Sequence, residues 1–327
     1  MKKEGRSERP FLLLWSWRDS FKGGVLEAVG FGQRLLESVE AKRSHVVVGL
    51  DPDYELLPAL VVEAHPRESY GSQVEMEAAC YRDFLMGLLP QVADHAVAIK
   101  IQIAYFETLG AAGWQLYEDL VRAGHDLGLL VIADVKRGDI GKTAEAYAVA
   151  HLDRAGVDAM TVNPYLGSDS VQPFLQRARG MGKGVFVLVK TSNPSSAEIQ
   201  DLEVSGGGAL YGRVAELVSE WGLGTRGDCG YASVGAVVGG THPQEGRQLR
   251  ALMPGVPLLV PGYGAQGAVA EDLGGFFDED GTGAVVNSSR GIIYAYRSHP
   301  DMGWQDAARL EVETMRAALW KAARHGG

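Results

Sequence analysis

Three charged residues that follow an apolar run give the sequence its clearest chemical signal. Residues 129–133 are typical of a strand buried on both faces of a parallel sheet, and Asp134, Lys136 and Asp139 come next. Because side chains alternate along a strand, we expect Asp134 and Lys136 to point to the same side. Buried charges are costly unless they are paired, so the cluster indicates a chemical role.

A structural explanation of the same cluster is open at this point. Lys136 could pair with one of the aspartates, while Asp139 or Thr143 caps the helix predicted over 143–155. Capping accounts for at most one of these residues, so we favour the chemical interpretation.

The elements that must position this cluster form a repeating pattern of strand, loop and helix. A leading amphipathic helix begins at Phe31, and Pro243 after Thr241 marks the start of a helix over 243–252. The predicted strands are 45–50, 96–101, 129–133, 159–162, 184–189, 233–238, 257–260 and 283–286. Regular alternation without a break in composition predicts a single-domain α/β fold, the (β/α)₈ TIM barrel, with an open doubly wound sheet as the alternative.

Residues 1–29 do not fit this pattern. Their charged start and short apolar run resemble a signal peptide only in part, and no small-residue cleavage site follows. We expect an N-terminal extension that is disordered or a start assigned too far upstream, with the barrel occupying residues 30–327.

Composition narrows the classes of function. The 327 residues are 46% hydrophobic and 22% charged, and the formal net charge of −10 argues against a nucleic-acid surface. The two cysteines, Cys80 and Cys229, have no metal or redox spacing, which favours a reduced, cytoplasmic protein. No run approaches the ~20 apolar residues of a membrane span. The motifs of zinc hydrolases and α/β-hydrolases are absent from the sequence.

Polar residues follow several of the predicted strands, and active sites of TIM barrels lie at that end of the strands. Asp51 follows the first strand, Lys100 ends the second, and Ser192 opens a Ser- and Gly-rich loop that reaches about Gly208. That loop is long for a barrel connection and is expected to act as a lid.

The loops after the last two strands predict a phosphate site. Pro261 and Gln266 lie in the glycine-rich segment after strand seven, and Arg290 follows strand eight. In TIM barrels these loops commonly bind phosphate through backbone N–H groups. Residues 262–267 also match the dinucleotide motif Gly-x-Gly-x-x-Gly, but too few strand–helix units follow them for a dinucleotide-binding domain.

The central motif resembles the signature of the orotidine 5′-monophosphate decarboxylase family, in its longer bacterial type 2 branch. It reads Asp134-Val-Lys136-Arg-Gly-Asp139-Ile140-Gly-x-Thr143. Further matches occur in the family's order: Gly49-Leu-Asp51-Pro-Asp, Lys100-Ile-Gln-Ile-Ala-Tyr-Phe-Glu, Thr191-Ser192-Asn-Pro, Pro261-Gly-Tyr-Gly-Ala-Gln266-Gly and Asn287-Ser-Ser-Arg290-Gly. Ile101 departs from the pattern, which has proline after the lysine. The resemblance extends from about residue 30 to the C-terminal region.

The resemblance implies a cofactor-free and metal-free decarboxylation of orotidine 5′-phosphate to uridine 5′-phosphate. Carried over by position, Lys136 protonates C6 of the pyrimidine and Asp134 lies beside the substrate carboxylate. Lys100 and Asp139 complete an alternating array of charges. An ammonium group held at C6 suits this reaction, because loss of carbon dioxide leaves a localised carbanion.

The resemblance also implies a homodimer with shared active sites and a nucleotide as the small-molecule substrate. Asp139, Ile140 and Thr143 would act in the site of the neighbouring subunit. The remaining substrate-binding residues implied are Asp51 for the ribose, Ser192 and Pro261 for the base, and Gln266 and Arg290 for the phosphate.

Two other functions stay open at this level. Related sugar-phosphate decarboxylases and aldolases use the Asp-x-Lys-x-x-Asp carboxylates to hold Mg²⁺, although an ammonium between two carboxylates makes a poorer metal site. The second alternative is a protein that binds nucleotide phosphates but has lost catalysis. Loss of catalysis is disfavoured because all four charged residues are present: Lys100, Asp134, Lys136 and Asp139.

Overall fold

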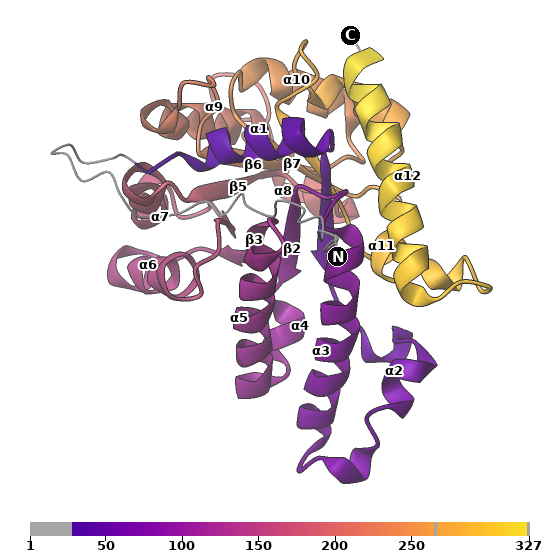
Figure 1. The fold of residues 1–327 in the computed structure, drawn as a ribbon. Coiled ribbons are helices and arrows are strands. Elements are labelled where there is room, and N and C mark those ends of the chain that lie inside the picture. Colours follow the sequence, from indigo (N-terminus) through magenta and orange to yellow (C-terminus); the bar gives the residue numbers. More distant parts are fainter. Residues whose placement is uncertain (1–27, 265–266, 326–327) are drawn as a thin grey trace, which may run out of the picture.

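A closed barrel of parallel strands forms the centre of the molecule in the computed structural model, which describes residues 28–264 and 267–325 (Figure 1). The strands pair in chain order, and β8 closes the barrel against β1. Their bounds are β1 Val46–Leu50, β2 Ala98–Gln102, β3 Leu130–Arg137, β4 Ala159–Val162, β5 Gly184–Lys190, β6 Val234–Val238, β7 Leu258–Pro261 and β8 Ala284–Ser288. The predicted TIM barrel is confirmed, and the open doubly wound sheet is wrong.

Helices surround the barrel, and Figure 1 shows α3 between α5 and α12 on its outside. Their bounds are α1 Phe31–Lys42, α2 Ala59–Glu63, α3 Gln73–Val92, α4 Ala104–Glu107, α5 Gly110–Asp126, α6 Gly141–Ala148, α7 Ser168–Met181, α8 Ala197–Gln200, α9 Leu210–Gly222, α10 Pro243–Leu252, α11 Arg290–Ile293 and α12 Trp304–His325. The helix predicted over 143–155 is observed as α6 with a π-helical continuation, Val149–Arg154. Helix α10 has the predicted bounds, but its N-cap is His242, without a side-chain capping bond.

Alternation along the strands separates two apolar cores. In β1, Val46 and Val48 pack against the surrounding helices, whereas Val47 points into the barrel. The inner core continues around the barrel and includes Phe31 and Leu35 of α1. Helix α1 therefore closes the barrel at the amino ends of the strands and leaves the carboxyl ends for the site.

The predicted N-terminal extension falls almost wholly on residues 1–27, which lie outside the described residues. The first described helix, α1, begins at Phe31, where the domain was expected to begin. Within the described part of the chain, no helix is both long and apolar enough to cross a membrane.

Candidate active site

The barrel interior changes from apolar to polar toward the carboxyl ends of the strands. The inner core contains Ala98 of β2, Ile132 of β3 and Ala159 of β4. Two residues further along, on the same side of each strand, are Lys100, Asp134 and Thr161, all of them buried. These polar side chains lie at the end of the barrel where TIM-barrel enzymes carry out their chemistry.

Asp134 is the centre of this polar layer. Its Oδ2 accepts hydrogen bonds from Lys100 Nζ at 2.7 Å and Gln102 Nε2 at 3.1 Å. Its Oδ1 accepts from Lys136 Nζ at 2.6 Å and from the Thr161 hydroxyl at 3.1 Å. The carboxylate thus lies between two ammonium groups, one on each oxygen, and the expected proximity of Asp134 and Lys136 is confirmed.

The charges fix each other's protonation states. Burial alone would raise the pKa of Asp134, but the ammonium groups of Lys100 and Lys136 hold it far below its ordinary value. Burial alone would lower the pKa of Lys100, yet the carboxylates of Asp134 and Asp51 keep that pKa above its ordinary value. Asp134 is therefore anionic and Lys100 cationic at neutral pH.

The two lysines differ in their access to a ligand. The Lys100 side chain is 5% exposed and the Lys136 side chain is 46% exposed. Lys136 also has a left-handed backbone conformation, with φ of 44°, which a residue with a side chain rarely adopts. Lys100 therefore holds the carboxylate from inside the barrel, and Lys136 presents an ammonium at its mouth.

Asp139 does not join this ion-pair chain within its own subunit. Its Oδ1 accepts a hydrogen bond from the backbone N–H of Ile140 at 2.8 Å. The N-cap of α6 is Ile140, and no side chain caps that helix, so the interpretation that Asp139 or Thr143 is a capping residue is wrong. Ile140 and Thr143 are both exposed.

Asp51 lies close enough to Lys100 to influence its pKa. Its Oδ1 atom is buried and has no hydrogen-bond partner in the described part of the chain, and the same is true of Asn287 Oδ1 in β8. Buried polar atoms are normally paired, so two such acceptors beside the charged layer are suited to the hydroxyl groups of a ligand. Asp51 was predicted from the sequence, whereas Asn287 was not.

Tyr105 of α4 also belongs to this site and was missed as a site residue in the sequence. Burial raises the pKa of its phenol, as do the carboxylates of Asp51 and Asp53, while Arg290 and Lys100 act in the opposite direction. The phenol is therefore within electrostatic reach of charged residues in or after β1, β2 and β8. Its position shortly after Lys100 and Gln102 in the sequence could have indicated that it lies at the site.

The loop after β5 contains short helices rather than irregular chain. Ser192 packs against the end of β6, where a side chain at Gly239 would come within 2.9 Å of the Ser192 backbone. Buried Lys190 at the end of β5 forms an ion pair with Asp201, and Gln200 accepts a hydrogen bond from the Thr191 N–H at 2.9 Å. These contacts hold the first part of the predicted lid, up to Asp201, at the barrel mouth.

The described glycines of the segment after β7 adopt conformations that favour glycine. Gly262, Gly264 and Gly267 have positive φ angles, and the N–H of Gly264 donates to the carbonyl of Ala268 at 2.9 Å. The segment leads into the 3₁₀ helix Ala270–Phe276 rather than into an α-helix, unlike a dinucleotide-binding turn. Gln266 lies outside the described residues.

Pro261 and Arg290 lie at or after the ends of the neighbouring strands β7 and β8. Pro261 of β7 pairs with Asn287 of β8, and Arg290 begins α11 after that strand. Arg290 is exposed and forms no ion pair among the described residues. Its guanidinium is thus available to an anionic ligand.

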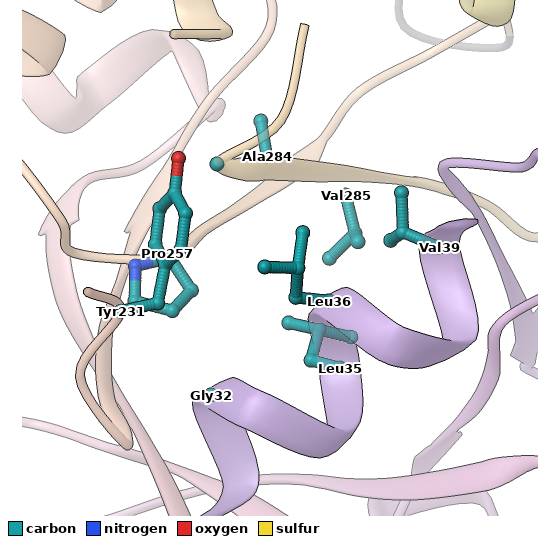
Figure 2. A pocket seen from close by; sticks show the side chains of 9 residues that line it. Gly32, Leu35, Leu36, Val39, Tyr231, Pro257, Ala284 and Val285 are labelled. Atoms are coloured by element: carbon teal, nitrogen blue, oxygen red, sulfur yellow. The ribbon is translucent and has the colours of Figure 1, made fainter. Parts of the chain in front are cut away.

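An apolar hollow lies at the opposite end of the barrel, between α1 and the starts of β7 and β8 (Figure 2). Leu35, Leu36 and Val285 line it, and no charged side chain does. Elsewhere, too, residues 28–264 and 267–325 contain no group of three or more His, Cys, Asp or Glu side chains arranged for a metal ion. The charged layer at the barrel mouth is therefore the strongest candidate site.

Comparison with known proteins gives consistent results. A sequence model of the orotidine 5′-phosphate decarboxylase / HUMPS family matches residues 44–300. Orotidine 5′-phosphate decarboxylase of Rhodopirellula baltica is 41% identical over 302 residues, which cover 88% of this chain and 98% of that protein. The Clostridium kluyveri protein of the same name is 38% identical over 294 residues, covering 89% and 97%. The structure of Leishmania donovani OMP decarboxylase superposes with a TM-score of 0.69 at 34% identity and covers 89% of this chain and 99% of its own.

Proposed function

The chain belongs to the orotidine 5′-phosphate decarboxylase / HUMPS family, and on that basis we propose a mechanism in which Lys136 is the proton donor. The enzyme is a carboxy-lyase that converts orotidine 5′-phosphate to uridine 5′-phosphate and carbon dioxide in pyrimidine biosynthesis. The observation that carries the proposed mechanism is the position of Asp134 between the ammonium groups of Lys100 and Lys136.

Electrostatics supplies most of the catalysis in this mechanism. Departure of carbon dioxide leaves a carbanion at C6 that no conjugated system delocalises, so stabilisation must come from fixed charge near that carbon. The half-exposed ammonium of Lys136 supplies that charge and then donates its proton to C6. Lys100, held at 2.7 Å from Asp134, keeps the carboxylate charged and in place.

Asp134 acts on the ground state. Its carboxylate lies next to the substrate carboxylate in this mechanism, and their repulsion disappears as carbon dioxide leaves. The pKa of Asp134 lies far below its ordinary value despite burial, so the residue does not escape this repulsion by taking up a proton at neutral pH.

The rest of the nucleotide is bound by groups around the barrel mouth. Asp51, with its unpaired Oδ1, binds the ribose hydroxyls together with Lys100. Ser192 and Pro261 contact the base, and Arg290 forms charge-assisted hydrogen bonds to the phosphate with Gln266. Binding of the phosphate supplies the free energy that closes the loop after β5 and orders the charged side chains.

A homodimer with shared sites is part of the proposal. Asp139 has no ion-pair partner among the described residues of its own chain and is therefore available to the Lys136 of a second subunit. The loops that follow the paired strands β3 and β4 also carry three exposed apolar side chains, here called the apolar rim: Ile140, Tyr165 and Leu166, which are 57%, 82% and 46% exposed. Covering this rim with a second copy would remove apolar surface from water. Free Cys80 and Cys229 suit the cytoplasm.

A direct assay tests the activity and its independence from metal. The chain is purified with a chelator, orotidine 5′-phosphate is added, and the ultraviolet absorbance of the pyrimidine is followed. We expect turnover to be unaffected by the chelator, because ammonium groups occupy both oxygens of Asp134, where a divalent cation would bind. Turnover only after Mg²⁺ is added would favour the related sugar-phosphate chemistry, and binding of uridine 5′-phosphate without turnover would favour a silent protein.

A further inference from the structure

Thr161 belongs to the same polar layer as Asp134, although nothing in the assigned chemistry uses it. It is a residue of β4, its side chain points into the barrel two positions beyond Ala159 of the inner core, and it is 1% exposed. Thr161 faces the segment of the adjacent strand β3 that carries Asp134 and Lys136.

The Thr161 hydroxyl makes three hydrogen bonds, all to that segment. It accepts from the backbone N–H groups of Val135 and Lys136, each at 2.9 Å. It donates to Asp134 Oδ1 at 3.1 Å, the oxygen that also accepts from Lys136 Nζ. A hydroxyl has one donor and two lone pairs, so the full capacity of this group is used on three consecutive residues.

These bonds replace the strand ladder at an irregularity. Ala133 pairs with Met160, but the next pair is Arg137 with Val162, so three residues of β3 face Thr161 alone. Extra residues in a bulge leave backbone groups without strand partners, and buried N–H groups need acceptors. The Thr161 hydroxyl is the acceptor for two of them.

The backbone at Lys136 is strained. Only Arg43 and Lys136 among the described non-glycine residues have a positive φ. Arg43 occupies the C-cap of α1, where the left-handed conformation is common. Lys136 lies in the irregular stretch of β3, one residue before the strand ends, and caps no helix, so its conformation persists only because its surroundings impose it.

We propose that Thr161 is a positioning residue for the decarboxylation, because its hydroxyl holds the strained backbone of Lys136 and thereby sets the ammonium against Asp134. The inference rests on the proposed role of Lys136. A purely structural Thr161 would satisfy two buried amides and contribute to stability, but its loss would not change catalysis selectively. The two roles therefore separate in kinetics.

Three variants of the full-length enzyme make the comparison. Thr161→Val keeps the shape and removes the hydroxyl, and Thr161→Ser keeps the hydroxyl. Thr225→Val is the matched control at the amino end of β6, because the Thr225 hydroxyl accepts from the Ser233 N–H at 3.0 Å and donates to the Gly222 carbonyl at 2.9 Å. For each, kcat, KM for orotidine 5′-phosphate, affinity for uridine 5′-phosphate and Tm are measured.

We expect Thr161→Val to lower kcat by roughly 10- to 100-fold, the cost of misplacing a reacting group by about 1 Å, with KM and product affinity changed only a few-fold. Thr161→Ser should restore most of kcat. Thr225→Val should lower Tm without a selective loss of kcat. A Thr161→Val enzyme with the kcat of the wild type, or with kcat reduced no more than in Thr225→Val, would overturn the proposal. If Thr161→Val does not fold, Thr161→Cys, with its weaker donor and acceptor, is measured against the same expectations.

Crystal structures of Thr161→Val and Thr161→Ser provide a readout that does not depend on turnover. In Thr161→Val we expect Lys136 to leave the left-handed region and its Nζ to move away from Asp134 Oδ1. In Thr161→Ser both features should match the wild type. Unchanged Lys136 geometry in Thr161→Val would overturn the positioning role even if the wild-type enzyme decarboxylates its substrate. A wild-type enzyme without turnover would count against the proposed function and leave this structural comparison decisive for Thr161.

Discussion

Lys136 Nζ lies 2.6 Å from Asp134 Oδ1, although Lys136 has a left-handed backbone and lies next to the end of its strand. The contact places the accessible ammonium beside a carboxylate that two lysines keep charged in spite of its burial. In the proposed mechanism this pair separates two tasks: the carboxylate destabilises the bound substrate, and the ammonium stabilises the carbanion that forms.

Replacement of Lys136 by alanine tests the proton donor. We expect kcat for orotidine 5′-phosphate to fall by at least about 10³-fold, because both the acid and the fixed charge at C6 are removed. Binding of uridine 5′-phosphate, measured by calorimetry, should remain within about 10-fold, since the proposed phosphate and ribose contacts lie elsewhere. Lys321→Ala, which removes a lysine from the outer helix α12, is the control and should keep the kcat of the wild type. Near-normal turnover by Lys136→Ala would refute the assignment.

Arg290 tests the phosphate site. Loss of its charge-assisted hydrogen bonds in Arg290→Ala should lower kcat/KM for orotidine 5′-phosphate by roughly 10- to 100-fold. The same change should have little effect on the much slower reaction of orotidine, which has no phosphate for the guanidinium to bind. Arg297→Ala, in the same C-terminal segment, is the matched control. Equal losses with both substrates would show that Arg290 acts on something other than the phosphate.

Most of the barrel could be predicted from apolar runs, and the exception is informative. The third strand was predicted to end at residue 133, but β3 continues to Arg137. The charges of Asp134 and Lys136 interrupt the apolar pattern, while pairing with β4 resumes beyond them at Arg137. Hydrophobic periodicity cannot detect a strand segment whose hydrogen bonds go to a side chain of its neighbour.

The site was predicted where its residues carry a distinctive local motif, and missed where the role depends on register. Thr161 lies in an apolar strand, where threonine is a common residue, so the sequence does not mark it as a site residue. Its three hydrogen bonds follow from its position opposite a bulge, which the sequence does not show. Asn287 and Tyr105 are significant only because the closed barrel brings β8 and α4 beside Asp51. The role of Asp139 depends on a second chain and stays a prediction.

Two buried histidines predict the acid sensitivity of the fold. Burial lowers the pKa of His45 and of His151 to about 4. The unfolded chain takes up these protons below about pH 6.5 and the native state does not, so stability is complete above that pH and is lost as the pH falls toward 4. The loss is about 3 kcal/mol for each histidine over that interval.

Urea unfolding at pH 7 and pH 5 measures this effect. The free energy of unfolding should be lower at pH 5, and His151→Gln, which can keep a hydrogen bond to Tyr117, should reduce the difference between the two pH values. His299→Gln, at a partly exposed position, should leave the difference unchanged. Equal stability of the wild type at both pH values would contradict the prediction.

Sharing of the active site between subunits gives the last prediction. In a dimer of Lys136→Ala with Asp139→Ala, one site has lost both groups, and the other combines the Lys136 of one chain with the Asp139 of its partner. Each variant alone should be nearly inactive. Random mixing at equal concentration makes half of the dimers heterodimers with one intact site, so activity should recover to about a quarter of the wild-type value.

The recovery must depend on exchange of subunits and on the pairing of the two defects. The variants are therefore unfolded and refolded together, with two affinity tags used to isolate the heterodimer, whose activity should be about half that of the wild type per dimer. Lys136→Ala mixed with Asp134→Asn is the control. Both changes then affect residues that contact each other within one chain, so every site keeps a defect and no activity should return. An isolated Lys136→Ala/Asp139→Ala heterodimer as inactive as its parents would place Asp139 in the site of its own chain, in spite of its missing ion pair there.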